Sequence, residues 1–509
     1  MAKQRTYLNI LCSIGTMAVN LGISFWLSPY IIRTIGVEAN GFVSLANSFV
    51  TWANLLVTAL NAMAARFITI AWVRGDREKA NLYYNSVFWG NLLIVGVLVL
   101  PAALLVAKLE AVISVPGDIL SDVKLLFSLV FALFFLRTAV PNWECAPSIT
   151  NRLDLVYLPE MAASLLRCVL LVGVFRIWIP RVWYVSVVSV VTGLLTLGIS
   201  AWNCRRLTPQ LGIRFRKPLC SRVVIRELVG SGIWSAVASG GNMLLTGLDL
   251  LVCNLYLGPT AMGILSISKT LPSVLIQLSD SIRGAFGPEL TICYAKGDRE
   301  GLYRCLVRAM KITSVVVTIP AAGLVVMSDA FYALWVPTQD ARLLQILTSL
   351  AVLSYLVNSG VVILFNVFSV VNRVKYNSAA MLLSGAASFL VTLVLIRFTD
   401  WDLYAVAGVS SIVIIGKNLL FTVPVASRLL GYKWNTFYPQ VGVSMLCSAV
   451  VMAIGILVRS LLSADTWAWF FLSCGLTGLL GLGANLLIVL TREEWKYLLA
   501  LLQKKLVRK

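Results

Sequence analysis

Charged side chains inside long apolar stretches are the residues of this chain best placed to do chemistry. Holding an ionised group in hydrocarbon costs roughly 3 kcal/mol or more, so such side chains face a protein interior or a water-filled cavity. Eight are basic and five are acidic: Arg66, Arg137, Glu144, Glu160, Arg167, Asp249, Lys269, Asp280, Arg283, Glu289, Arg308, Lys311 and Lys417. The excess of bases predicts a cationic cavity that receives an anionic ligand.

The first candidates for that cavity are bases with no acidic residue near them in the sequence. Arg66, Lys269 and Lys417 meet this condition. Arg283 joins them unless Asp280 neutralises it, because residues three apart lie on one face of a helix. We therefore interpret these bases as candidate substrate-binding residues.

Arg137 has two open interpretations. Glu144 follows it seven residues later, and Glu160 precedes Arg167 by the same interval, so these four residues could form ion pairs between neighbouring helices. Arg137 is therefore either a structural ion-pair partner or a further substrate-binding residue.

Carboxylates at Asp249, Asp280 and Glu144 are candidates for binding a coupling proton or sodium ion. The chain contains no histidine, which excludes histidine proton relays, histidine metal ligands and Ser-His or Cys-His catalysis. Gly416-Lys417 lacks the Ser or Thr that completes a phosphate-binding loop. We expect no enzyme activity, no cofactor and no metal.

The elements that position these residues are membrane-spanning helices. Hydrophobic residues make up 59% of the chain and charged residues 13%, with a mean hydropathy of +0.87. A span needs about 20 mainly apolar residues. Fourteen windows qualify, at about 7–32, 42–73, 82–107, 125–147, 157–175, 182–203, 228–257, 264–295, 306–327, 343–371, 376–396, 403–427, 439–458 and 467–491. The sequence predicts an all-α polytopic membrane protein.

Lysine and arginine residues predict the orientation of these spans. Most of them fall at the two termini and in the loops after even-numbered windows, which places both termini in the cytoplasm. The net charge of +20 is then mainly a topology signal, and no motif for nucleic acid accompanies it.

The tetrapeptide Gly-Asp-Arg-Glu occurs at 75–78 and again at 297–300, an offset of 222 residues that also relates Gly41 to Gly263. Such a repeat in a membrane protein is typical of transporters. The predicted parts are a six-helix repeat at 1–203, a basic cytoplasmic linker at 204–227, a second parallel six-helix repeat at 228–427, two appended spans at 428–491 and an amphipathic tail helix at 492–509.

Two of these parts carry further expectations. The linker and the tail are basic, so we expect them to bind anionic lipids of the inner leaflet. In the last span, four glycines predict a face for close helix packing: Gly475, Gly478, Gly481 and Gly483.

Three segments taken together resemble a known family. They are SPYIIRTIGVEANGF at 28–42, the Gly-Asp-Arg-Glu turn, and NRLDL at 151–155. This set is similar to the polysaccharide transporters, the flippases of O-antigen and capsule repeat units, within the multidrug/oligosaccharidyl-lipid/polysaccharide exporter superfamily.

The resemblance implies a V-shaped pair of six-helix bundles in the bacterial plasma membrane. Its substrate would be an undecaprenyl-pyrophosphate-linked glycan, moved from the inner to the outer leaflet by alternating access. Two alternatives within the superfamily stay open, a multidrug/cation antiporter and a peptidoglycan-precursor (lipid II) flippase. The antiporter branch typically has an acid in its first span, and residues 7–32 contain none, although Asp249 keeps that reading open.

Overall fold

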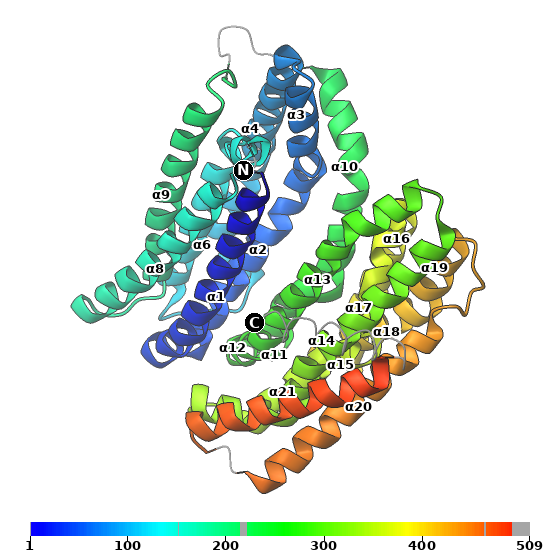
Figure 1. The fold of residues 1–509 in the computed structure, drawn as a ribbon. Helices are drawn as coiled ribbons and strands as arrows, with labels where there is room; N and C mark the ends of the chain where they lie inside the picture. The colour runs from blue at the N-terminus through cyan, green and yellow to red at the C-terminus, as the bar shows by residue number, and fades with distance from the viewer. Residues whose placement is uncertain (1, 151, 214–220, 463–464, 491–509) are drawn as a thin grey trace. The chain divides into compact units, whose positions relative to one another are not determined.

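The computed structural model describes residues 2–150, 152–213, 221–462 and 465–490, and every regular element within them is a helix (Figure 1). The described residues form two compact units, with the boundary between residues 266 and 267. Each unit is described by itself below.

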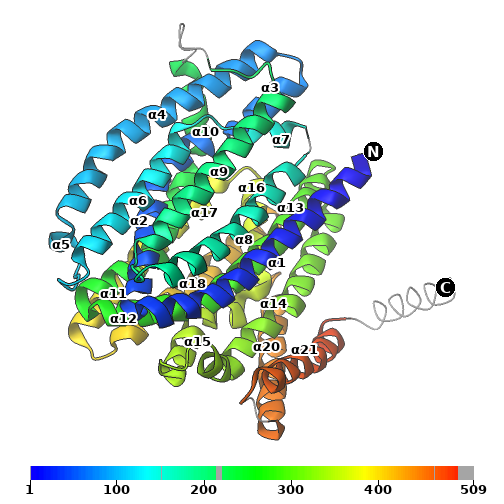
Figure 2. The ribbon, with the colours of Figure 1, turned by 90° about the vertical axis from the view of Figure 1, so that its left-hand side faces the viewer.

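Unit 1 consists mainly of long helices. Its elements are α1 (Ala2–Ile35), α2 (Val37–Asn61), α3 (Ala64–Val73), α4 (Arg77–Ala107), α5 (Leu109–Val112), α6 (Leu120–Ala139), α7 (Cys145–Ile149), α8 (Asp154–Ile177), α9 (Tyr184–Leu207), α10 (Arg222–Asn242), the π-helix η1 (Met243–Gly247), α11 (Asp249–Leu257) and α12 (Pro259–Ser268), whose last two residues lie beyond the unit boundary. α1 lies along α8 (Figure 2), α6 packs between α2, α4 and α9, and α10 packs on α2.

Unit 2 is built around its longest helix, α14. Its elements are α13 (Thr270–Ala295), α14 (Arg299–Trp335), α15 (Ala341–Asn358), the 3-10 helix η2 (Ser359–Leu364), α16 (Phe365–Val370), α17 (Val374–Phe398), α18 (Asp402–Lys417), the π-helix η3 (Asn418–Thr422), α19 (Val423–Leu429), α20 (Tyr438–Leu461) and α21 (Trp467–Val489). Ala309, Ala321 and Ala322 of α14 are fully buried. Small side chains there let neighbouring helices approach closely.

The prediction of an all-α polytopic membrane protein is confirmed. Eleven helices of the described residues are long and apolar enough to cross a membrane, or twelve if the pair α12 and α13, bent by 40°, is one span. The predicted window 7–32 lies within α1, whereas the window 125–147 is only partly right: α6 ends at Ala139, and Glu144 lies in the turn that follows it. Neither α1 nor α6 is in this set. α6 carries three charged residues, Asp122, Lys124 and Arg137, within its 20 residues.

The two Gly-Asp-Arg-Glu segments adopt the same helix-starting turn. Gly75 and Gly297 have φ values of 82° and 69°, a region that favours glycine because it has no Cβ. The next residue caps the following helix in each copy: Asp76 accepts from the Lys79 N–H at 2.9 Å, and Asp298 accepts from the Gly301 N–H at 2.8 Å. The division of the chain into two six-helix repeats remains a prediction.

Residues at the repeat offset also touch one another within unit 1. Thr260 donates a hydrogen bond to Glu38 at 2.6 Å across 222 residues of sequence. A Cβ added to Gly41 would lie 2.9 Å from the Cα of Gly263. Equivalent positions meet in this way when they lie near the axis that relates two similar segments, here 36–41 and 258–263.

The start of the predicted linker is fixed to α4 by side-chain amides. Asn81 donates to the Gln210 carbonyl at 2.9 Å and accepts from the Gly212 N–H at 3.2 Å, while Asn85 donates to the Gly212 carbonyl at 3.0 Å. Residues 214–220, and the predicted tail helix at 492–509, lie outside the described residues.

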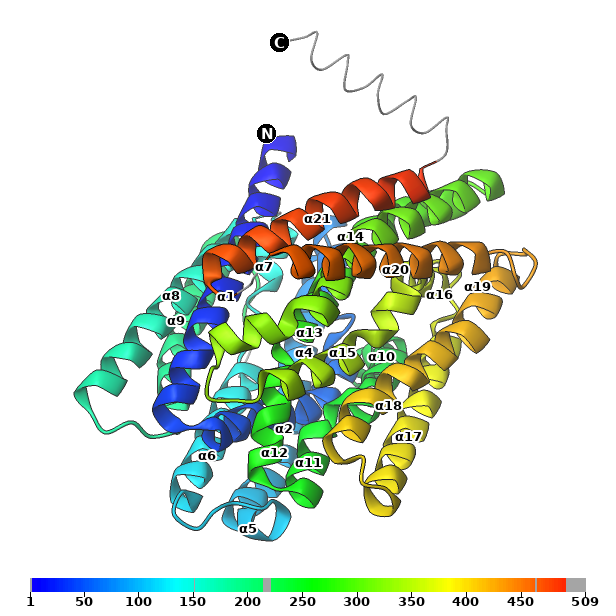
Figure 3. The same ribbon diagram turned by 90° about the horizontal axis from the view of Figure 1, so that it is seen from below.

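The predicted appended spans correspond to α20 and α21, which lie against α14 (Figure 3). Arg459 of α20 forms an ion pair with Asp329 of α14, and Asn485 of α21 donates to Thr318 of α14 at 2.9 Å.

The predicted glycine face of the last span is only partly right. Gly481 packs on Val451, where an added Cβ would lie 3.2 Å from a Val451 methyl group. The other three glycines, Gly475, Gly478 and Gly483, would meet nothing within 4 Å.

Candidate functional site

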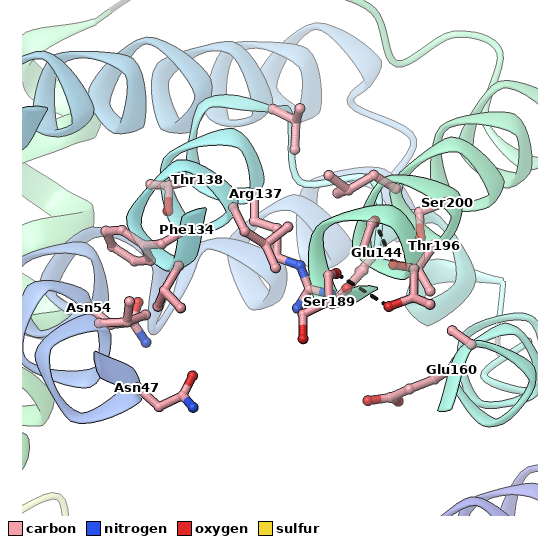
Figure 4. A pocket seen from close by; sticks show the side chains of 18 of the residues that line it. Asn47, Asn54, Phe134, Arg137, Thr138, Glu144, Glu160, Ser189, Thr196 and Ser200 are labelled. Atoms are coloured by element: carbon pink, nitrogen blue, oxygen red, sulfur yellow. Dashed lines mark hydrogen bonds between the residues drawn. The ribbon is translucent and has the colours of Figure 1, made fainter. Parts of the chain in front are cut away.

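Unit 1 contains a cavity of about 880 Å³, lined by α2, α4, α6, α8, α9 and the turn at 140–144 (Figure 4). This volume lies near the upper end of the range of roughly 300–1,000 Å³ that is usual for small-molecule sites. Four of the charged residues singled out in the sequence line it: Arg137, Glu144, Glu160 and Arg167.

The two arginines approach the cavity from different helices. Arg137 extends from α6 to within 3.5 Å of the position where Gly193 of α9 would carry a Cβ, and Arg167 comes from α8. The buried Arg167 Nε has no hydrogen-bond partner among the described residues. Two guanidinium groups thus line the cavity and offer paired donors to an anion such as a phosphate. Glu144 and Glu160 line it as well, so the predicted excess of bases over acids is not found in this lining.

The cross-helix ion pairs expected for these four residues do not form. In the described part of the chain, neither Arg137 nor Arg167 lies within ion-pair distance of Glu144 or Glu160. Arg137, Glu144 and Glu160 are instead exposed to the cavity (Figure 4). The reading of Arg137 as a substrate-binding residue therefore gains support over its reading as a structural partner.

Uncharged polar side chains form most of the remaining wall, and the sequence analysis overlooked them. Asn47, Asn54 and Asn61 of α2 line the cavity at intervals of seven residues, which is about two helical turns. Serines and threonines of α9 line it as well: Ser186, Ser189, Thr192, Thr196 and Ser200. The regular spacing of amides within an apolar window was the signal that could have revealed this wall.

Two other predicted residues of unit 1 lie away from the cavity. Arg66 is exposed on α3 and is not among the lining residues. Asp249 is buried at the start of α11, directly after the π-helix η1. Such π-helical turns are frequent at functional sites, so Asp249 remains a candidate for ion coupling.

The remaining predicted residues belong to unit 2. Asp280 and Arg283 form the expected ion pair along one face of α13, at 2.9 Å, so Arg283 is not an unpaired base. Lys269 lies at the 40° break between α12 and α13. None of these three lines the cavity of unit 1.

Lys417 of unit 2 has an apolar environment. Its ammonium group lies 4.6 Å from the centre of the Phe365 ring and 3.8 Å from the Met381 sulfur. It ends α18 where the π-helix η3 begins. A cation over an aromatic face is stabilised electrostatically, which accounts for a half-buried lysine without an acidic partner among the described residues.

Solved structures share this fold. The chain covers 98% of a structure of the lipid II flippase MurJ in an inward closed conformation, with a TM-score of 0.65, 16% identity and 94% of this chain aligned. It covers 95% of an inward-facing multidrug resistance MATE family transporter of the MOP superfamily, with a TM-score of 0.61, 12% identity and 81% of this chain aligned. The shared fold and the long apolar helices thus define a polytopic membrane protein whose structural relatives are transporters.

Sequence relatives identify the family. A model of the polysaccharide biosynthesis protein family matches residues 8–288, more than half of the chain. The chain belongs to this family. It is also 28% identical over 461 residues to EpsK, an uncharacterized membrane protein of Bacillus subtilis (strain 168), with 90% of each protein covered.

Proposed function

We propose that this protein is a flippase that moves an undecaprenyl-pyrophosphate-linked oligosaccharide from the inner to the outer leaflet of the bacterial plasma membrane by alternating access. The observation that carries the proposal is the pair Arg137 and Arg167, which faces an open polar cavity without ion-pair partners in the described residues. The negatively charged oxygens of a diphosphate can accept hydrogen bonds from both guanidinium groups. A glycan can form hydrogen bonds with the hydroxyl and amide groups around the pair. The family's role in polysaccharide biosynthesis supports the same substrate class.

The membrane potential can drive this transport without ATP. Moving a charge of about −2 outward across an inside-negative membrane gains on the order of 2.3 kcal/mol per charge per 100 mV. The charged residues that line the cavity are two arginines and two glutamates, whose formal charges cancel, so the empty site returns to the inward face without moving net charge against the field. Coupling to H⁺ or Na⁺ is an additional proposal, and Glu144 is its best-placed residue because it lines the cavity with the arginines.

Fourteen spans with both termini in the cytoplasm are part of the proposal. The helices support this number because α1 and α6, added to the twelve candidates, give one helical span for each apolar window. In a cysteine-free background, Gly117→Cys should react with an impermeant thiol reagent on intact cells. Arg206→Cys should react only after permeabilisation. Labelling of Arg206→Cys from outside would show that this topology is wrong.

Depletion of the protein in its own cells tests the proposed substrate. Surface polysaccharide should fall to near zero while its lipid-linked precursor accumulates in the membrane. Sensitivity to cationic drugs should stay unchanged. Greater drug sensitivity with normal surface polysaccharide would favour a multidrug antiporter, and lysis with accumulated lipid II would favour a peptidoglycan-precursor flippase.

A further inference from the structure

The amide wall of α2 differs from residue to residue in what it offers a ligand. Asn61 exchanges hydrogen bonds with Asn91 of α4, at 2.7 and 3.2 Å, so both amides are largely satisfied. Asn47 donates to the Val43 carbonyl of its own helix at 2.9 Å. Asn54, midway between them, makes no side-chain hydrogen bond within the described residues and is exposed to the cavity (Figure 4). Asn54 therefore presents two N–H donors and a carbonyl acceptor to whatever enters.

The hydroxyl groups of α9 offer a ligand further hydrogen-bond acceptors. Ser189 donates to the Val185 carbonyl at 2.7 Å, and Thr196 donates to the Gly193 carbonyl at 2.8 Å. Because their protons are used within the helix, their oxygens are left as acceptors facing the cavity. A ligand that fits these groups carries several hydroxyl donors and also some acceptors.

We propose that Asn54 of α2, together with Ser189 and Thr196 of α9, binds the saccharide on the two sides of Arg137, with a role distinct from that of the arginine pair. Arg137 lies between Asn54 and Thr196 in the cavity (Figure 4), so a diphosphate held by the arginines places the attached sugar beside these groups. Sugar hydroxyls donate to the α9 oxygens and pair with the Asn54 amide. Uncharged residues then determine which glycan is bound, because a site that hydrogen-bonds a hydroxyl group rejects ligands that leave its polar groups unpaired.

This inference rests on the proposed function, and two probes separate the two claims. The first probe is undecaprenyl pyrophosphate, which has the charge and no sugar. The second is the lipid-linked oligosaccharide extracted from cells that produce this protein. Binding of both is measured on the purified full-length protein in nanodiscs.

Asn54→Leu should weaken binding of the sugar-bearing lipid about tenfold, as expected for the loss of one or two hydrogen bonds, and should leave binding of undecaprenyl pyrophosphate unchanged. Thr196→Val, which keeps the side-chain volume, should show the same pattern. Arg137→Gln should weaken both probes equally. Leu56→Ala, at an exposed position of α2 that does not line the cavity, should change neither.

Thermal unfolding of each purified variant is recorded to confirm that it folds. The proposed saccharide binding is wrong if Asn54→Leu and Thr196→Val weaken both probes equally or leave both unchanged in folded protein. If the wild-type protein binds neither probe, the proposed function fails together with the saccharide binding.

Discussion

Replacing Arg137 and Arg167 together with glutamine should reduce the surface glycan to the level of cells that lack the protein. Each arginine is expected to contribute about 1.5–3 kcal/mol through charge-assisted hydrogen bonds to a phosphate, which is a factor of roughly ten or more apiece. The amount of protein in the membrane should stay the same, because no described ion pair is broken by the change. Surface glycan is measured by immunoblot or chemical analysis, and protein by quantitative blotting of membranes.

Two further variants make this experiment specific. Single replacements by lysine should keep part of the activity, because the charge remains while the paired donors of the guanidinium are lost. Arg176→Gln, an exposed position on the same helix as Arg167 and outside the cavity, should export normally. If the double variant exports normally, or fails only because the protein no longer accumulates, the arginines are structural.

Replacing Gly263 with valine should separate α12 from α2. A Cβ at Gly263 would lie 2.6 Å from the Val37 carbonyl oxygen, and backbone cannot yield as a flexible side chain can. Overpacking of this kind costs about 1–3 kcal/mol or more. In a cysteine-free background, a short bifunctional thiol reagent should cross-link Glu38→Cys to Thr260→Cys efficiently, since the native side chains of these residues are hydrogen-bonded to each other, and Gly263→Val should reduce the cross-linking yield to background.

Gly173→Val is the matched control for this contact. An added Cβ at Gly173 of α8 meets nothing within 4 Å, so neither the cross-linking yield nor thermal unfolding should change. Unaltered cross-linking in Gly263→Val protein would mean that the close approach of the two helices is not a feature of the folded protein.

Features that depend on local sequence were predictable. The helical class follows from the length of the apolar windows. The turns at Gly75 and Gly297 follow from the Gly-Asp-Arg-Glu tetrapeptide, because its glycine adopts a positive φ and its aspartate caps the next helix. The ion pair between Asp280 and Arg283 follows from their spacing on one helix. In each case the interacting groups lie within a few residues of one another.

The cavity depends on how helices pack, which spacing in the sequence does not determine. Intervals of seven residues allowed Arg137 and Arg167 to pair with carboxylates on neighbouring helices, yet α6 and α8 present the arginines to the cavity instead. Asn54 was overlooked because the search followed charge, and an amide in an apolar window carries none. Lys417 likewise has an aromatic partner, Phe365, which a search for acidic partners does not find.

A structure of the purified protein with bound lipid-linked pyrophosphate is the most direct test of the central claim, which is that the cavity of unit 1 receives the anionic head group. The proposal predicts density for the two phosphates within hydrogen-bond distance of the guanidinium groups of Arg137 and Arg167, with the first sugar toward Asn54. A head group bound at Arg283 or Lys417 in unit 2, with the cavity of unit 1 free of ligand, would contradict it.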